Sequence, residues 1–246
     1  MKKVSAFSIG IATASILGFA NQTIVQAQTP AVQNTQQEEP SETKVLVSEV
    51  VIVGGTDNLK EIVSQTIQIQ AGNNITRAQL QQDINAIFST GYFANVRAVP
   101  EETPEGVRIQ FVVEPNPVLR AVKIQNNQAL PQEVVNQSFN QQYGHILNLK
   151  QLQTGVQKLN KWYQDNGYAL AQVIDSPKIN PDGTVTLQVA EGIIEDIQIQ
   201  FVNPEGEEAK GKTQPYIITR EMQLKPGDIF QRELAQKDLQ RVFRLG

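Results

Sequence analysis

A helical segment bounded by two glycines constrains the fold of this chain more than any other stretch. After Gly72, Thr76 is placed as an N-cap, and apolar residues then recur at spacings of four, three and one. These apolar residues are Leu80, Ile84, Ile87 and Phe88. Their spacing predicts a single apolar stripe along a helix. Gly91 comes next, and a glycine at that place can adopt the left-handed conformation that ends a helix.

The same pattern occurs twice more along the chain. Gly227 and Gly246 are nineteen positions apart, as Gly72 and Gly91 are, and they enclose Leu239, Val242 and Phe243. A looser copy between Gly144 and Gly167 has four extra residues before its closing glycine. Its apolar residues are Leu147, Leu152, Val156, Leu159 and Trp162. Three copies with a repeat of roughly 75 residues predict an array of small modules.

The N-terminus has the composition of a secretory signal peptide. Lys2 and Lys3 precede an apolar run that leads to a small-residue cleavage site at Ala27, so residues 1–27 are predicted to be removed. A membrane anchor is the alternative, and it is disfavoured because the run is short and interrupted by three serines. Residues 28–43 are rich in Gln, Glu, Pro, Ser and Thr and are predicted to be a disordered linker.

The remaining chain is predicted to form three modules, at residues 44–115, 116–192 and 193–246. In the first, periodicity and turn residues predict strands at 45–53, 92–99 and 107–113, helices at 59–67 and 76–91, and an acidic turn at 100–106. The predicted fold class is therefore α+β, with tandem β-α-α-β-β modules. Each module is expected to be a three-stranded mixed sheet with two helices on one face.

The second module repeats this order, and the third repeats only part of it. Strands are predicted at 118–124, 168–174 and 184–189, helices at 133–139 and 149–166, and a hairpin turn at 180–183. The third module has a predicted strand at 193–202 and helices at 216–224 and 231–245. It lacks the last two strands, so we expect this sequence to be part of a longer protein.

The edges of such sheets are the candidate functional sites. An edge strand has unpaired N–H and C=O groups, which must be blocked or can accept an incoming strand. The two candidate edges are residues 93–99 and 168–174, which carry at most one charge each. The candidate binding residues on them are Phe93, Asn95, Val96, Arg97, Tyr168, Leu170, Gln172 and Val173.

Residues suited to catalysis or to metal binding are scarce. His145 is the single histidine, there is no cysteine, and we interpret His145 as a solvated turn residue. Asp83 and Asp238 occupy the same place in their repeats and are interpreted as helix-surface residues that orient the long helices. The sequence thus predicts no enzyme, no cofactor and no metal site. Loss of Lys2 and Lys3 takes the formal charge from −4 to −6, which argues against a nucleic-acid partner.

The repeat resembles the polypeptide-transport-associated (POTRA) domains of BamA-type outer-membrane assembly proteins. The resemblance covers residues 45–246 and is most specific at 83–93, 224–227 and 238–243. Residues 111–118 and 216–221 are similar to the cyanobacterial and chloroplast-translocon branch. The resemblance implies an exported protein of the outer membrane whose POTRA part lies on the periplasmic side, before a C-terminal β-barrel.

The resemblance also implies the partners. Unfolded outer-membrane protein clients would bind by strand addition, and the modules would dock to the protein's own barrel, with periplasmic accessory proteins or peptidoglycan as further partners. Two alternatives stay open: a two-partner secretion or translocon pore component, and a structural spacer that binds the cell wall. The third module disfavours the two-partner system, whose members resemble a two-module version.

Overall fold

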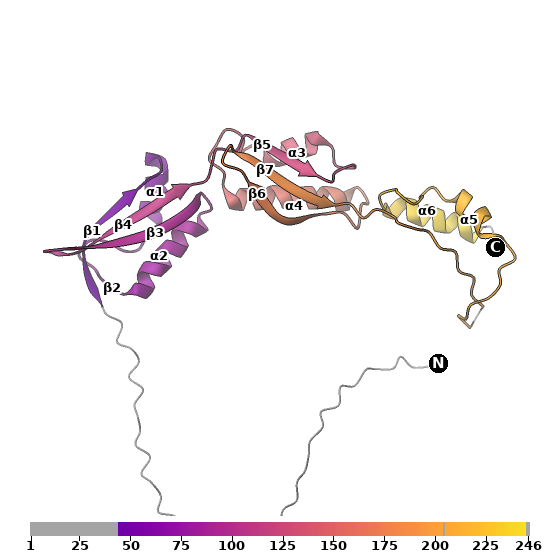
Figure 1. Cartoon of the computed structure of the whole chain (residues 1–246), viewed down its shortest axis with the longest axis horizontal. Helices are drawn as coiled ribbons and strands as arrows, with labels where there is room; N and C mark the ends of the chain where they lie inside the picture. The colour runs from indigo at the N-terminus through magenta and orange to yellow at the C-terminus, as the bar shows by residue number, and fades with distance from the viewer. Residues whose placement is uncertain (1–43, 204, 245–246) are drawn as a thin grey trace, which may run out of the picture. The chain divides into compact units, whose positions relative to one another are not determined.

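The computed structural model describes residues 44–203 and 205–244 (Figure 1). The predicted signal peptide, 1–27, and the predicted linker, 28–43, lie outside the described residues. Two sheets and two hydrophobic cores are present in the described part, one of each in the first module and one of each in the second. No helix among these residues has both the length and the apolar character needed to cross a bilayer.

The first module contains a four-stranded mixed sheet with strand order β2-β1-β4-β3. Its elements are β1 (Val45–Val53), α1 (Asp57–Thr66), β2 (Asn74–Ile75), α2 (Arg77–Ser89), β3 (Phe93–Thr103) and β4 (Gly106–Pro115). β1 pairs with β4 in parallel, and β3 pairs with β4 in antiparallel orientation. The predicted α+β class is confirmed, and the short strand β2, which no pattern predicted, adds to the free side of β1.

The core of the first module lies between its sheet and its helices. Alternate residues of β4, among them Ile109 and Phe111, are buried, because successive side chains of a strand point to opposite faces. They pack in one cluster with Val63 of α1 and Ile87 of α2. The two helices therefore cover one face of the sheet (Figure 1).

Helix α2 begins and ends where the sequence predicts. The Thr76 hydroxyl accepts from the Gln79 N–H at 3.3 Å, and the Gln79 side chain accepts from the Thr76 N–H at 2.9 Å, so both residues form a capping box. Gly91 has φ = +87° and donates its N–H to the Phe88 carbonyl at 3.1 Å. A residue with a side chain would be strained at this φ, which explains the glycine.

The second module has the predicted three strands, in the order β5-β7-β6. Its elements are β5 (Ala121–Gln125), α3 (Gln132–Phe139), α4 (Leu149–Asp165), β6 (Gln172–Ile179) and β7 (Thr184–Ala190). The predicted hairpin turn joins β6 to β7, with the Gly183 N–H donating to the Asn180 carbonyl at 2.9 Å. Leu159 of α4 and Leu187 of β7 are among the most deeply buried residues of the core.

Two predicted strands have other limits in the structure. β3 continues from residue 99 to Thr103, so the predicted acidic turn shrinks to residues 104–105. The Pro100 that suggested a turn is accommodated because β3 lies at an edge of the sheet. The strand predicted at 168–174 begins only at Gln172, since Tyr168 instead stacks on Trp162 with ring centroids 5.9 Å apart.

The strand predicted at 193–202 is wrong for the described structure. Only isolated bridges occur there, between Ile193 and Ile229 and between Val202 and Glu208. In the first two modules the opening strand pairs with the last strand of the same module, and no such last strand occurs among the described residues after 202. The predicted helices are present as α5 (Pro215–Glu221) and α6 (Arg232–Phe243).

Asp83 and Asp238 are buried, so the prediction of surface positions is wrong. Their exposed fractions are 2% and 0%. The Asp83 carboxylate accepts from the backbone N–H groups of Gln68 and Ile69 at 2.9–3.0 Å. Asp238 accepts in the same way from two backbone N–H groups, those of residues 223 and 224. Each carboxylate thus ties the long helix to the segment that precedes it.

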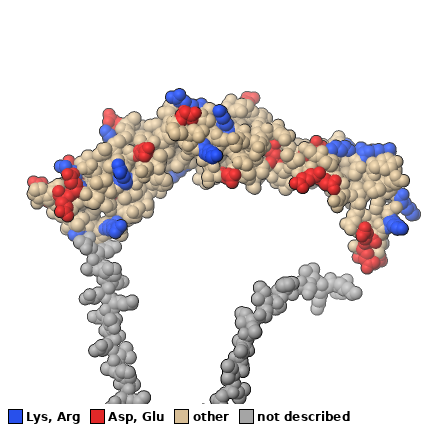
Figure 2. All heavy atoms as spheres, viewed as in Figure 1, with Lys and Arg blue, Asp and Glu red and all other residues tan. Residues whose placement is uncertain are grey.

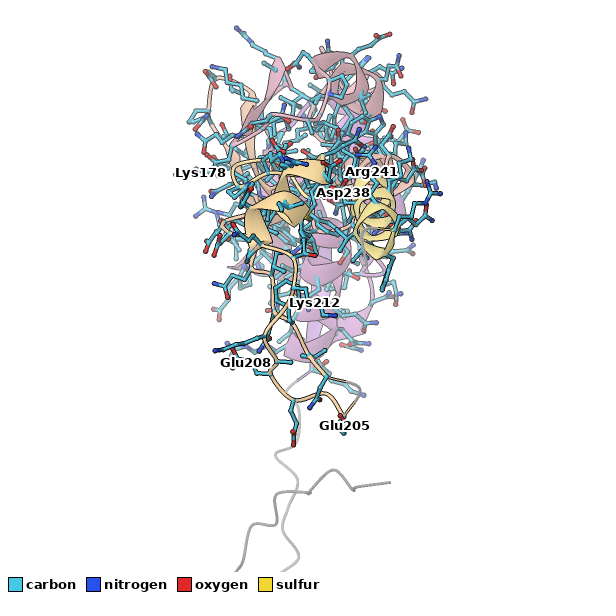
Figure 3. All side chains as sticks on the ribbon, turned by 90° about the vertical axis from the view of Figure 1, so that its right-hand side faces the viewer. Lys178, Glu205, Glu208, Lys212, Asp238 and Arg241 are labelled. Carbon is cyan, nitrogen blue, oxygen red and sulfur yellow. The ribbon has the colours of Figure 1, made fainter. Side chains whose placement is uncertain are left out.

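Arg241 of α6 lies beside this buried carboxylate in the third module. Its Nη1 is 3.6 Å from the Asp238 carboxylate. Both residues are labelled in Figure 3. In the second module the matching helix position is Gly155, where an added Cβ would lie 2.1 Å from the Phe139 ring. Glu191 supplies the buried carboxylate there instead, accepting from the Tyr163 hydroxyl at 2.8 Å. Burial raises the pKa of Tyr163, and this hydrogen bond adds to the effect, so the phenol remains a donor.

We predict that Asp83→Ala lowers the free energy of unfolding of the first module by about 2–4 kcal/mol, because two N–H groups would lose their acceptor. Native-state hydrogen exchange at the Phe111 amide measures this change. Gln82→Ala, an exposed neighbour on α2, is the matched control and should stay within about 0.5 kcal/mol of the native chain. Equal effects of both substitutions would contradict a tethering role for Asp83.

Candidate functional site

The strand order makes β3 a free edge of the first sheet. β3 has one neighbour, β4, and its pairing runs without a register shift from Asn95 to Thr103. None of the described side chains forms a hydrogen bond with the backbone of residues 94–102. The second neighbour that a central strand would have is therefore absent from the described part of the chain.

The pairing of Pro100 shows which residues point their backbone groups to the free side. Residues of an antiparallel edge strand alternate between facing their partner and facing away from it. Pro100 pairs with Ile109 but has no N–H, so it belongs to the set that faces away. By the same alternation, Val96 and Ala98 also present their N–H and C=O groups to the free side. These two residues form the usable part of the edge, between the register shift before Asn95 and Pro100.

A groove of about 620 Å³ lies beside this edge, between α2 and β3. Its walls are mainly apolar in the middle and charged at one end. Its lining includes Leu80, Ile84, Ala98, Pro100, Arg77 and Glu102, and residues of β1, β2 and β4 complete it. An extended peptide paired to Val96 and Ala98 would therefore place alternate side chains against an apolar helix face.

The apolar stripe of α2 continues past this groove to Phe88, whose exposed fraction is 48%. Leu80, Ile84 and Phe88 follow one another at spacings of four, which places them on one helix face. Helix α6 has the same stripe, with Leu239 and Phe243 exposed to 57% and 82%. Phe88 and Phe243 thus occupy the same repeat position as exposed phenylalanines.

The corresponding edge of the second module, β6, is interrupted. Its pairing with β7 shifts register between Ile174 and Lys178, Asp175 has φ = +62°, and Pro177 lacks an N–H. The outward N–H of Val173 already donates to the side chain of Asn160 at 2.8 Å. A smaller groove of about 410 Å³ remains between α4 and β6, lined mainly by apolar residues.

The structure separates the sequence-predicted candidates into three groups. Asn95, Val96 and Arg97 lie on the free edge β3, and among them Val96 turns its backbone groups outward. Phe93 is fully buried in the core. Tyr168 and Leu170 precede β6. Of the candidates in the second module, Gln172 and Val173 lie within this strand.

Asn160 is a residue that the sequence reasoning missed. Ala98 lies within the predicted edge 93–99 but was not among the candidate binding residues, and Phe88 was assigned only to the apolar stripe of its helix. Alternation along β3 points to Ala98 once Val96 is known, whereas no local pattern distinguishes Asn160 from a solvated helix residue. His145 is exposed in its turn, as predicted.

Charged residues on the described surface are interspersed rather than gathered. Figure 2 shows acidic and basic side chains scattered over a mostly uncharged face. On the sheet face away from the helices, Arg108 donates to Glu49 at 2.7 Å and lies 3.5 Å from Glu101. The hydrogen bond to Glu49 and the charge of its carboxylate raise the pKa of Arg108. The visible face has no continuous basic patch of the kind that a polyanion binder needs.

Comparison with known proteins identifies the modules. Residues 118–192 match the family described as "POTRA domain, ShlB-type", and residues 45–116 match the POTRA family described as "Surface antigen variable number repeat". The two sheets are thus POTRA domains, small modules that occur in tandem.

Two solved structures are similar to this chain over most of its length. The N-terminal domain of Omp85 from Thermosynechococcus elongatus is 53% identical, with 83% of this chain and 87% of that chain covered and a TM-score of 0.79. POTRA domains 1–3 of Omp85 from Anabaena are 50% identical, with coverages of 84% and 87% and a TM-score of 0.72. The chain belongs to the Omp85 family and contains POTRA domains of that family.

A curated plant relative matches this chain over part of its own length. The chloroplastic outer envelope protein 80 of Arabidopsis thaliana is 30% identical over 217 residues, which are 84% of this chain and 29% of the relative. The chain spans about a third of the length of the curated relatives that it matches over most of its residues.

We predict that Phe88→Ala changes the stability of the first module by less than about 1 kcal/mol, because Phe88 is half exposed. Ile87→Ala, at the adjacent and fully buried position, should cost about 2–5 kcal/mol. Native-state hydrogen exchange at Phe111 compares the two variants. A cost for Phe88 as large as that for Ile87 would assign Phe88 to the core instead of the surface stripe.

Proposed function

We propose that this chain is the periplasmic POTRA portion of an outer-membrane β-barrel protein insertase and binds client polypeptides by strand addition. In this proposal, extended client segments pair with the free edge of a POTRA sheet through backbone hydrogen bonds. The modules hold these segments on the periplasmic side and dock to a barrel that follows in the same protein. No catalytic residue takes part.

The unpaired edge of β3 beside an apolar groove is the observation that carries the proposal. An edge strand supplies a row of backbone donors and acceptors, which gives affinity without a requirement for one sequence. The groove supplies a wall for alternate side chains. Membership of the Omp85 family supports the periplasmic placement, because the Anabaena relative is described as part of a periplasmic domain.

The proposal predicts that Val96→Pro weakens binding of an extended peptide at least tenfold, since it removes an outward N–H and blocks pairing. The probe is a capped eight-residue peptide that alternates valine or leucine with threonine or serine, titrated into the chain by calorimetry. Val96→Ala keeps the backbone donor and is the matched control. Circular dichroism of both variants checks that the fold is retained.

Two outcomes would contradict the proposal. Equal affinity of the native chain and a folded Val96→Pro variant would exclude pairing at this edge. Retention of the chain on peptidoglycan, with no peptide binding at all, would favour the structural spacer that binds the cell wall.

A further inference from the structure

The two POTRA sheets have equivalent edge strands, β3 and β6, which differ in whether an outward N–H group is hydrogen-bonded. Val96 on β3 and Val173 on β6 hold matching places, because each pairs with the last buried valine of its central strand, Val113 and Val189. In the second module the Val173 N–H is occupied by Asn160. In the first, none of the described side chains forms a hydrogen bond with the backbone around Val96.

The helix position that decides this difference is the same in both modules. Thr76 is the N-cap of α2 and Asn148 is the N-cap of α4. Twelve residues after each N-cap, the first module has Phe88 and the second has Asn160. An amide side chain can satisfy a strand N–H that would otherwise be open, whereas a phenyl ring cannot. One residue type at one repeat position therefore leaves the edge open or closes it.

The rest of β6 adds to the closure. The positive φ of Asp175 and the shifted register interrupt the row of backbone groups, and Pro177 offers no N–H. Bulges and prolines are the devices by which natural sheets block their edges. Within its regular pairing β3 has no bulge, its one proline is Pro100 at the end of the open stretch, and the single charged residue of that stretch is Arg97.

We infer that, of the two equivalent edges β3 and β6, strand addition uses residues 95–99 of β3 in the first module, and that Asn160 closes the edge β6 of the second module. The inference rests on the proposed function, because it names the site and the kind of peptide for that binding. The open stretch is five residues long and presents two outward residues, Val96 and Ala98.

The chemistry of the two sides of this stretch specifies the peptide. Side chains of a paired peptide that face α2 would meet Leu80, Ile84 and Phe88, which are apolar. Side chains on the other face would lie beside Asn95, Arg97 and Val99, which are exposed and of which only Val99 is apolar. The fitting occupant is an extended segment of about five residues that alternates apolar and polar side chains. This is also the period-two pattern of strands in outer-membrane barrels.

The test is a reciprocal exchange at the shared helix position. Phe88→Asn is expected to close the first edge and to weaken binding of the alternating eight-residue peptide at least tenfold. Phe88→Ala removes the ring without adding an amide. Its smaller loss of peptide affinity measures the contribution of the ring alone. Asn160→Ala should release the Val173 N–H and speed its hydrogen exchange about five- to tenfold, as expected for the loss of one hydrogen bond.

Amide chemical shifts of the native chain then locate the bound peptide. Changes in amide chemical shift at residues 94–99 on peptide binding, with no change at 172–179, would support the inference. A loss of peptide affinity in Phe88→Asn that exceeds the loss in Phe88→Ala would support it as well. Shifts at 172–179 in the native chain, or unchanged Val173 exchange in Asn160→Ala, would overturn the inference and leave strand addition itself intact. Absence of binding at either edge would overturn the proposed function, and this inference with it.

Discussion

The parallel pairing of the first strand of a module with its last strand is the interaction on which the rest of the structure depends. β1 lies beside β4, and β5 lies beside β7. The last strand is thereby flanked on both sides, so the strand before it in the hairpin has one neighbour and becomes an edge. Residues 193–202 illustrate the same dependence, because no last strand lies beside them in the described part and they form only isolated bridges.

The two equivalent edges β3 and β6 differ in how their backbone groups are satisfied. In β6 the outward N–H of Val173 donates to the side chain of Asn160, and the pairing is interrupted around Asp175 and Pro177. β3 keeps regular pairing up to Thr103 and leaves its outward groups to another polypeptide or to water. A repeated fold can therefore contain one receptive module and one closed module, with little change in the backbone that both share.

The buried carboxylates show that a structural role can persist while its residue moves. Asp83 and Asp238 occupy one helix position and hold the preceding segment through its N–H groups. In the second module that position is Gly155, which leaves room for the Phe139 ring, and Glu191 after β7 binds two N–H groups before α3 instead. The requirement is a carboxylate acceptor for backbone N–H groups in a buried or partly buried segment, and more than one position in the fold can supply it.

The sequence by itself determined the local structure, because caps, apolar stripes and closing glycines act over a few residues. Thr76 and Gly91 bound α2 where their residue types predict, and the threefold recurrence indicated small α+β modules. Only the tertiary structure decided which edge is open, since strand order and register depend on contacts between residues far apart in the chain. The same reason applies to Asn160, which becomes distinct from any other polar helix residue only when the fold brings it within 2.8 Å of the Val173 N–H.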